Sequence, residues 1–392
     1  RAENWGKGMW FGGRREGNDA ALERAVWRWK IGMGGTVGDL YGKGGMLYYA
    51  VALANALSSR CSTRLILPRK PPGFYSGLSE QVELSQVQVP EDFSRSNLVR
   101  LPYFAAAFPS LVRRVTEEHP DIVHFTNENI WLTALAPMVD VRRLVWTLHD
   151  PVIHSGDSLR KKISTRILGK LSRKIFVHYR FNFEMAVKEG FDPSKLIVIP
   201  HGDYNFHEKF IRPDVNSRRM ILFWGRIRPY KGIESLIDSA RFLPEDVEIV
   251  IAGEGAGIYE SRTKGDTRIK LIDRFLSERE IAELCQQSSV VVTPYIDASQ
   301  SGIVPVAYAF SKPVVATSVG ALPEQVDDGV TGLLTPPNQP EKLAEALNKI
   351  INNPELAKSM GAAGYRKSHT DMAWDSIADT VYSTYESVLE KV

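Results

Sequence analysis

Short runs rich in Val, Ile and Leu alternate along most of the chain with longer segments that suit helices. Such runs are typical of buried strands, and their alternation with helical segments is typical of parallel sheets. We therefore predict an α/β fold built from parallel sheets. The strands are expected at residues 27–32, 64–67, 122–125, 144–147, 175–178, 196–199, 220–224, 247–252, 269–272, 290–293 and 314–317.

The segment 45–58 is the most apolar predicted helix, and it follows a glycine-rich stretch that ends in Gly44 and Gly45. Glycine lets the backbone approach a ligand closely, and a helix start carries partial positive charge. Binding of an anion at this turn is one interpretation. A purely structural glycine turn is the other.

The polar stretch 203–219 contains Pro213 and shows little periodicity, so it is the predicted linker. A chain of 392 residues is also longer than one hydrophobic core usually organises. We expect two Rossmann-like halves that face each other across a cleft at the carboxyl ends of their strands. The predicted parts are an N-terminal domain, a C-terminal domain and a last helix, at 1–205, 206–375 and 376–392, and residues 1–30 fit no pattern.

The stretch 287–337 reads as a strand, a loop of small residues, a helix and a second strand. This order places backbone N–H groups and the positive helix end above the carboxyl end of the strand, which favours phosphate binding. We predict that this loop holds a diphosphate. The expected donors are Gln300 and the backbone of Ser301, Gly302 and Ile303.

Two basic residues, Arg226 and Lys231, follow Gly225 between a predicted strand and helix. Arg grips phosphate oxygens in pairs and Lys offers a mobile charge, so both suit a departing diphosphate. Ordinary surface cations are the alternative. No Asp-x-Asp motif and no His/Cys cluster with metal spacing is visible, so no metal and no other cofactor is expected. The chain also has no well-spaced G-x-G-x-x-G fingerprint, which disfavours a nicotinamide dehydrogenase.

His149 follows the predicted strand 144–147 and is expected at the edge that faces the cleft. A neutral imidazole can donate and accept a hydrogen bond at once. Asp150, beside it, is expected to orient the loop or to bind an acceptor. A histidine that only satisfies its hydrogen bonds at a strand end is the alternative.

Several of these segments together resemble the retaining family 4 glycosyltransferases, which have the GT-B fold. The matching segments are Gly44-Gly45, Gly225-Arg226 with Lys231-Gly232, IAGEG at 251–255 and GALPE at 320–324. The resemblance implies a hexosyltransferase that uses a nucleotide diphosphate sugar and a glycan or lipid-linked acceptor, with retention of configuration. It also implies that His149 contacts the donor sugar, and that the last helix returns to the first domain.

The chain departs from that family at one place. The family carries two glutamates separated by seven residues, and the corresponding positions here are Ser299 and Ala307. Asp297 adjoins the first position and is expected to replace it in part. The sugar or acceptor contacts are thus expected from Asp150, Asp297, Ser299 and Glu324. A partner subunit that has lost turnover is the alternative to an enzyme, although Arg226, Lys231 and His149 are all present.

The net charge of +3 is too small to suggest a nucleic-acid partner. Seven basic residues nevertheless crowd the segment 160–174, and such a helix can lie on an anionic membrane. A solvated helix face is the alternative. The two cysteines are expected to be buried and reduced, and no segment suits a membrane span or a secretory signal. These features predict a cytoplasmic protein at the inner face of the membrane.

Overall fold

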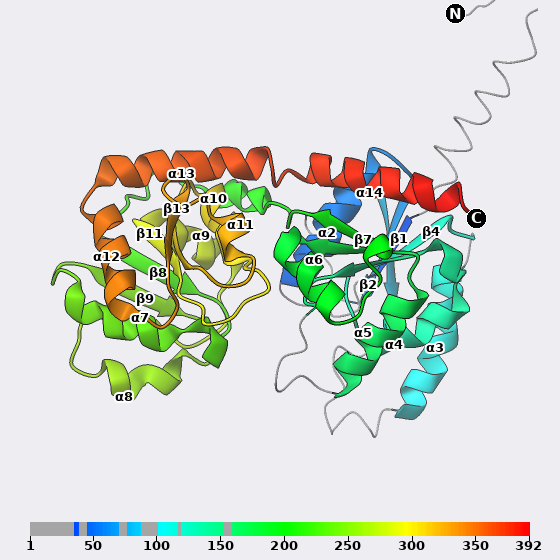
Figure 1. Cartoon of the computed structure of the whole chain (residues 1–392), viewed down its shortest axis with the longest axis horizontal. Helices are drawn as coiled ribbons and strands as arrows, with labels where there is room; N and C mark the ends of the chain where they lie inside the picture. Colours follow the sequence, from blue (N-terminus) through cyan, green and yellow to red (C-terminus); the bar gives the residue numbers. More distant parts are fainter. Residues whose placement is uncertain (1–34, 39–44, 70–76, 88–100, 117–118, 152–158) are drawn as a thin grey trace, which may run out of the picture.

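The computed structural model describes residues 35–38, 45–69, 77–87, 101–116, 119–151 and 159–392. Two parallel β-sheets lie side by side in the molecule, each with helices packed around it (Figure 1). The first sheet draws on residues 35–199 and the second on residues 220–335. The predicted α/β architecture is confirmed.

The first sheet has seven strands in the order β3-β2-β1-β4-β5-β6-β7, all parallel. Its central strands are buried on both faces because helices cover them, which explains why their sequences read as continuous apolar runs. The strands are β1 Gly35–Gly38, β2 Thr63–Pro68, β3 Val82–Val87, β4 Ile122–Phe125, β5 Leu144–Leu148, β6 Lys174–His178 and β7 Leu196–Ile199.

The second sheet has six parallel strands in the order β10-β9-β8-β11-β12-β13. In both sheets the order reverses beside the first strand, and ligands of such sheets bind at the carboxyl ends near that reversal. The strands are β8 Met220–Trp224, β9 Glu248–Ala252, β10 Ile269–Ile272, β11 Val290–Thr293, β12 Val314–Thr317 and β13 Gly332–Thr335.

Helices lie between most pairs of successive strands, as parallel sheets require. The predicted apolar helix is α2, which buries Tyr49, Leu53 and Leu57. The helices are α2 Gly45–Ser58, α3 Leu101–Thr116, α4 Ile130–Leu135, α5 Leu159–Leu171, α6 Tyr179–Lys188, α7 Ile233–Ser239, α8 Glu260–Thr263, α9 Glu278–Gln287, α10 Ile303–Ala309, α11 Leu322–Gln325, α12 Pro340–Ile351, α13 Pro354–His369 and α14 Trp374–Leu389.

Most predicted strands coincide with observed strands to within one or two residues. The strand predicted at 27–32 lies outside the described residues. Strands β1, β3 and β13 were not predicted from the sequence, and β1 falls in the glycine-rich stretch before α2. The domain limits at residues 205 and 375 stay a prediction. Within the described ranges, no helix combines the length and the apolar character needed to cross a bilayer.

The chain crosses from the first sheet to the second between β7 and β8, which is the first crossing. It crosses back at the junction of α13 and α14, which run one after the other across both halves (Figure 1). Helix α14 packs against α2 and buries Ile377, Val381 and Tyr385 in the core of the first half. At the junction, Trp374 Nε1 donates to the carbonyl oxygen of Asp203 at 2.9 Å. This bond ties the second crossing to the first.

Glu324 on α11 also links the two halves, because it bonds to the start of α6 in the first half. Its carboxylate oxygens accept hydrogen bonds from the backbone amides of Arg180 and Phe181, each at 2.8 Å. These amides lie in the first turn of α6, whose own N-cap residue, His178, makes no side-chain cap. Glu324 therefore caps a helix of the opposite half, where the positive helix end favours a carboxylate.

Four buried histidines gather at the carboxyl end of the first sheet: His124, His149, His178 and His201. Burial lowers the pKa of His124 and of His149 to about 3 and that of His201 to about 4, and it places the pKa of His178 well below its ordinary value. Burial disfavours the charged form of each imidazole. All four are therefore neutral in the folded protein at neutral pH.

Replacing Glu324 by Ala should uncap α6 without disturbing either sheet. Loss of a helix cap costs about 1 kcal/mol, and the amides of Arg180 and Phe181 should exchange faster with deuterium. Hydrogen exchange of the peptide that covers the start of α6 measures this effect. Glu341→Ala is the control, because that exposed carboxylate pairs with Arg241 in the second half. Unchanged exchange at α6 in Glu324→Ala would contradict the cap.

Acid should destabilise the protein through the four histidines. An unfolded histidine has a pKa of about 6.5, so below that pH the unfolded chain binds protons that the folded chain refuses. Stability is therefore full above about pH 6.5 and falls as the pH decreases, by about 1.4 kcal/mol per pH unit for each histidine. Urea unfolding at about pH 7 and pH 5.5 measures the slope. His178→Gln should flatten this slope, and equal slopes in wild type and His178→Gln would count against the assignment.

Candidate active site

The loop after β8 and the loop after β11 are fastened to each other in the second half. Ile296 N donates to the carbonyl oxygen of Tyr230 at 2.7 Å. Gly232, with φ +62°, passes so close to the carbonyl oxygen of Pro294 that a side chain there would overlap it. Gly225, with φ +119°, faces the side chain of Ile303. The two predicted phosphate-binding segments are thus brought together, as parallel topology favours.

Lys231 lies in this junction with its ammonium on an aromatic surface. Its Nζ is 3.7 Å from the ring centroid of Tyr295 and 5.1 Å from that of Tyr230. Burial lowers the pKa of Lys231 to about 7. The face of an aromatic ring attracts a cation, but it does not replace the carboxylate that usually pairs with a buried lysine. Near neutral pH, Lys231 is therefore present in both its charged and its neutral form.

The loop that precedes α10 is held by Gln325. Gln325 Oε1 accepts from Ser301 N at 2.8 Å, and Gln325 Nε2 donates to Ser301 O at 2.9 Å. Ser301 Oγ in turn accepts from Ile303 N at 3.3 Å and bonds to the Tyr295 hydroxyl at 2.9 Å. The amides of Ser301 and Ile303 thus both donate within the chain in this structure, and their binding of a diphosphate stays a prediction.

Gln300 and His149 meet across the two halves. Gln300 Nε2 lies 3.5 Å from His149 Nδ1, and Gln300 Oε1 is a buried atom without a hydrogen-bond partner in the described part of the chain. Amide carbonyl oxygens that are buried usually find a donor. Gln300 thus extends from the loop after β11 toward His149, which follows β5. Its Oε1 is available to accept a hydrogen bond.

The hydrogen bonds of His149 fix its tautomer. His149 Nε2 lies 2.9 Å from the carbonyl oxygen of Thr126, which can only accept, so Nε2 carries the proton. Nδ1 is then an acceptor with one lone pair, and it lies 3.2 Å from His178 Nε2 and 3.5 Å from the Gln300 amide nitrogen. His178 Nδ1 lies 3.3 Å from the carbonyl oxygen of Pro200, which can only accept, so the neutral His178 carries its proton on Nδ1 and the donor to His149 is the Gln300 amide. The edge of the Tyr49 ring packs against the imidazole at 4.6 Å between centroids. His149 is therefore held as a neutral hydrogen-bond acceptor toward the other half.

The remaining charged candidates lie around the same junction. The side chain of Arg226 is 60% exposed, and its Nε lies 4.0 Å from Glu254 Oε2. Asp150 pairs with Lys161 Nζ at 3.2 Å. Asp150, Lys161 and Arg226 all act on the pKa of Tyr230, which places the first half's loop close to Tyr230. Asp297 is exposed on the loop after β11.

Two predicted sugar contacts have other roles in this structure. Glu324 caps α6, so its carboxylate is already occupied by two amides. The backbone oxygen of Ser299 accepts from Asn182 Nδ2 at 3.2 Å, which adds a second bond between the halves. Ala307 is fully buried in α10. Gly44 lies outside the described residues, and Gly45 is the first residue of α2.

Three residues that position the candidate site were not predicted from the sequence. Tyr295 supports Lys231, Gln325 holds Ser301, and Asn182 contacts Ser299. Tyr295 follows the strand predicted at 290–293, and Gln325 follows GALPE at 320–324. Both could have been predicted from these neighbouring segments. Asn182 gave none, because its partner is far away in the sequence. Among the described residues, no three His, Cys, Asp or Glu side chains are grouped so that they could hold a metal ion.

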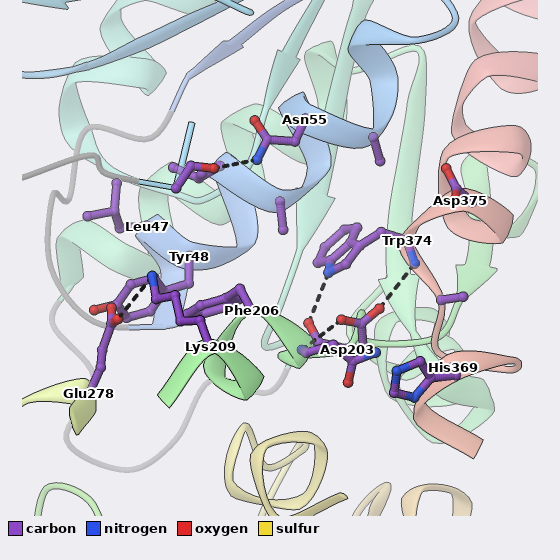
Figure 2. Close-up of a pocket in the computed structure, with 16 residues that line it drawn as sticks. Leu47, Tyr48, Asn55, Asp203, Phe206, Lys209, Glu278, His369, Trp374 and Asp375 are labelled. Atoms are coloured by element: carbon purple, nitrogen blue, oxygen red, sulfur yellow. Dashed lines mark hydrogen bonds and ion pairs between the residues drawn. The ribbon is translucent and has the colours of Figure 1, made fainter. Parts of the chain in front are cut away.

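A cavity of about 610 Å³ lies at the two crossings, away from the residues just described (Figure 2). Its wall combines the outer face of α2, the short helix η5 Asn205–Phe210 and the α13–α14 junction. Figure 2 shows Trp374 bonded to Asp203 on one side and Lys209 beside Glu278 on the other. The cavity contains none of the predicted donor-site residues, so we do not assign the donor to it.

Two family models match the chain in succession. Residues 43–202 match Glycosyltransferase Family 4, and residues 206–367 match Glycosyl transferases group 1. An uncharacterized glycosyltransferase of Methanocaldococcus jannaschii is 32% identical over 50% of this chain and 52% of its own length. The D-inositol 3-phosphate glycosyltransferase of Mycobacteroides abscessus is 26% identical over 73% of this chain and 71% of its own. The chain thus spans about half the length of the first relative.

A solved structure of Anabaena HepE in complex with UDP-glucose superposes with a TM-score of 0.71 over 91% of this chain and 100% of that one, at 19% identity. This likeness shows the fold. With two successive family models and the facing parallel sheets, the chain belongs to the family 4, group 1 glycosyltransferases and has their GT-B fold.

Proposed function

We propose that this chain transfers a hexose from a nucleotide diphosphate sugar to a glycan or lipid-linked acceptor, with retention of configuration and without a resident metal ion. One observation carries the proposal. The Lys231 ammonium is fixed on Tyr295 beside the Ser301 loop, while His149 approaches the same loop from the other half. A cation, a loop of small residues and a neutral imidazole thus converge where the two sheets face each other.

In this proposal the charge on the departing diphosphate is neutralised by side chains. Lys231 supplies a point charge whose proton is retained once a diphosphate lies next to it, because a nearby anion favours the ammonium. Arg226 is exposed and long enough to add a bidentate contact. Of the three amides expected from the loop, the one left for a phosphate is that of Gly302, since those of Ser301 and Ile303 are used.

His149 and Gln300 would bind the sugar rather than the phosphates. His149 Nδ1 accepts, and Gln300 brings both an amide donor and an unpartnered oxygen to the same point. A hexose carries hydroxyl groups that donate and accept in close succession, which suits such a pair. Gln300 thereby stands near the position where the family's first glutamate would be, with hydrogen bonds but no charge.

The alternative is a partner subunit that binds a nucleotide sugar without transferring it. The specific observation in its favour is that neither Ser299 nor the buried Ala307 offers a carboxylate. Binding of a nucleotide would fit both proposals. Release of the nucleoside diphosphate in the presence of an acceptor would fit the transferase alone.

Nucleoside diphosphates should raise the melting temperature of the protein, since they bind the folded state. We expect at least one of UDP, GDP and ADP to do so. Lys231→Met removes the ammonium but keeps an apolar chain on Tyr295, so it should weaken binding about 10- to 100-fold, the worth of one hydrogen bond to a charged group, with little change in stability. Lys264→Met, at an exposed position in the same half, is the control.

The affinity of the protein for the nucleotide should also depend on pH. Because the pKa of Lys231 is about 7, affinity should fall up to about tenfold between pH 6 and pH 8 as the free enzyme loses its ammonium. UDP-glucose is the suitable probe if UDP binds, because its two esterified phosphates do not titrate in this range. The dependence should vanish in Lys231→Met. If none of the three diphosphates shifts the melting temperature, the donor site is wrong.

Helix α5 is the proposed contact with an anionic membrane. It exposes Arg166 and Lys170 together with Ile163, whose side chain is 45% exposed. Basic and apolar groups on one exposed helix suit a lipid surface. This contact would bring a lipid-linked acceptor to the first half.

The protein should co-sediment with phosphatidylserine vesicles at low salt. Each basic residue near such a surface is worth about 1 kcal/mol, so replacing Arg166 and Lys170 by Gln should lower vesicle binding about 30-fold. Replacing Lys342 and Lys358, which lie on α12 and α13, serves as the control. Failure of the wild type to sediment, or equal binding by both double variants, would exclude α5 as the contact.

A further inference from the structure

Tyr204 lies between the two halves and has no role in the function proposed above. It follows the first sheet and directly precedes η5, so it lies in the first crossing of the chain. The residue is only 5% exposed. Its ring stacks on His201, with centroids 5.7 Å apart and planes 10° from parallel, and it also packs against Phe206. The ring is therefore held firmly.

The hydroxyl of Tyr204 lies between glycines of both halves. It donates to the carbonyl oxygen of Gly45 at 3.4 Å, which is a long bond. A side-chain carbon built on Gly45 would lie 3.3 Å from this hydroxyl, and one built on Gly302 would lie 3.7 Å from it. One oxygen thus bonds to the start of α2 in the first half and lies near Gly302, the residue before α10, in the second.

Gly302 is the residue whose amide the proposed function assigns to the donor diphosphate, and Gly45 begins the helix for which the sequence offers anion binding as one interpretation. We infer that the Tyr204 hydroxyl is a binding residue of that site and donates a hydrogen bond to a phosphate oxygen. This inference rests on the proposed function and adds a donor that comes from the crossing segment itself. A hydroxyl that bonds to a charged oxygen makes a shorter and stronger bond than it does to a peptide carbonyl.

The chemistry of the hydroxyl supports this role over a purely structural one. Burial raises the pKa of Tyr204, so the group stays a neutral donor throughout the physiological range. Its long bond to Gly45 is weak, and a rotation about the C–O bond redirects the proton without moving the ring. The amides of Ser301 and Ile303 are already used, so the site gains from a donor outside that loop.

Tyr204→Phe tests the inference, because it keeps the stacked ring and removes one oxygen. UDP affinity, measured by calorimetric titration, should fall about 5- to 30-fold, as expected for one hydrogen bond to a charged group less the bond already made to Gly45. The affinity for uridine, which has no phosphate, should not change. The melting temperature of the free protein should stay close to that of the wild type.

Tyr48→Phe is the matched control. Tyr48 is a neighbouring tyrosine whose hydroxyl bonds to Glu278 and whose ring lines the cavity at the crossings. It should leave UDP affinity unchanged. If wild type and Tyr204→Phe bind UDP equally, or if Tyr204→Phe weakens UDP and uridine by the same factor, the inference is overturned while the donor site stands. If the wild type binds no UDP, GDP or ADP, the proposed function fails and the inference with it.

Discussion

The site depends on a constraint that neither sheet meets alone: the carboxyl ends of two separate parallel sheets must be held facing each other. The chain crosses between them twice, and α14 anchors the second crossing by burying Ile377, Val381 and Tyr385 against α2. Burial of such side chains is worth about 1.5 to 3 kcal/mol each, which exceeds any single polar contact at the interface. The polar contacts therefore adjust a geometry that the apolar helix pair establishes.

Three of the polar contacts between the halves lie close to the candidate site. Glu324 caps α6, Asn182 reaches Ser299, and Gln300 reaches His149. All three join the loops after β11 and β12 to elements that follow β5 and β6. Interfaces of this kind usually permit relative motion of domains. The residues that fix the distance between the sheets are thus the neighbours of those that would hold a ligand.

The sequence predicted those parts of the fold that depend on local composition. Most strands in the middle of a sheet are covered on both faces, so their apolar runs were found to within one or two residues. Strand β1 is central too, but its sequence GTVG gives no apolar run and it was not predicted. Strands β3 and β13 lie at the outer edges of their sheets. Strand β3, VELSQV, mixes apolar and polar residues and exposes two successive positions, and β13 is only GLLT, so neither gives a continuous apolar signal.

For the candidate site too, the sequence predicted only those features that depend on local composition. That Gly225, Lys231, Gly302 and His149 follow strands is a local property, and parallel topology then brings them to facing edges. Which hydrogen bonds they make is not local. Gln325 takes the amide of Ser301, and Glu324 serves a helix in the other half. Such pairs are decided by contacts between segments more than 20 residues apart, for which one sequence contains no direct signal.

The electrostatics of the site follow from the same separation into halves. The first half contributes imidazoles that burial keeps neutral, and the second contributes Lys231, which rests on aromatic rings without a carboxylate ion pair in the described part of the chain. A permanent buried charge would be costly in the empty cleft, and a permanent ion pair would have to break before a phosphate could bind. A lysine with a pKa near 7 avoids both costs, since it accepts its proton together with the anion that stabilises it.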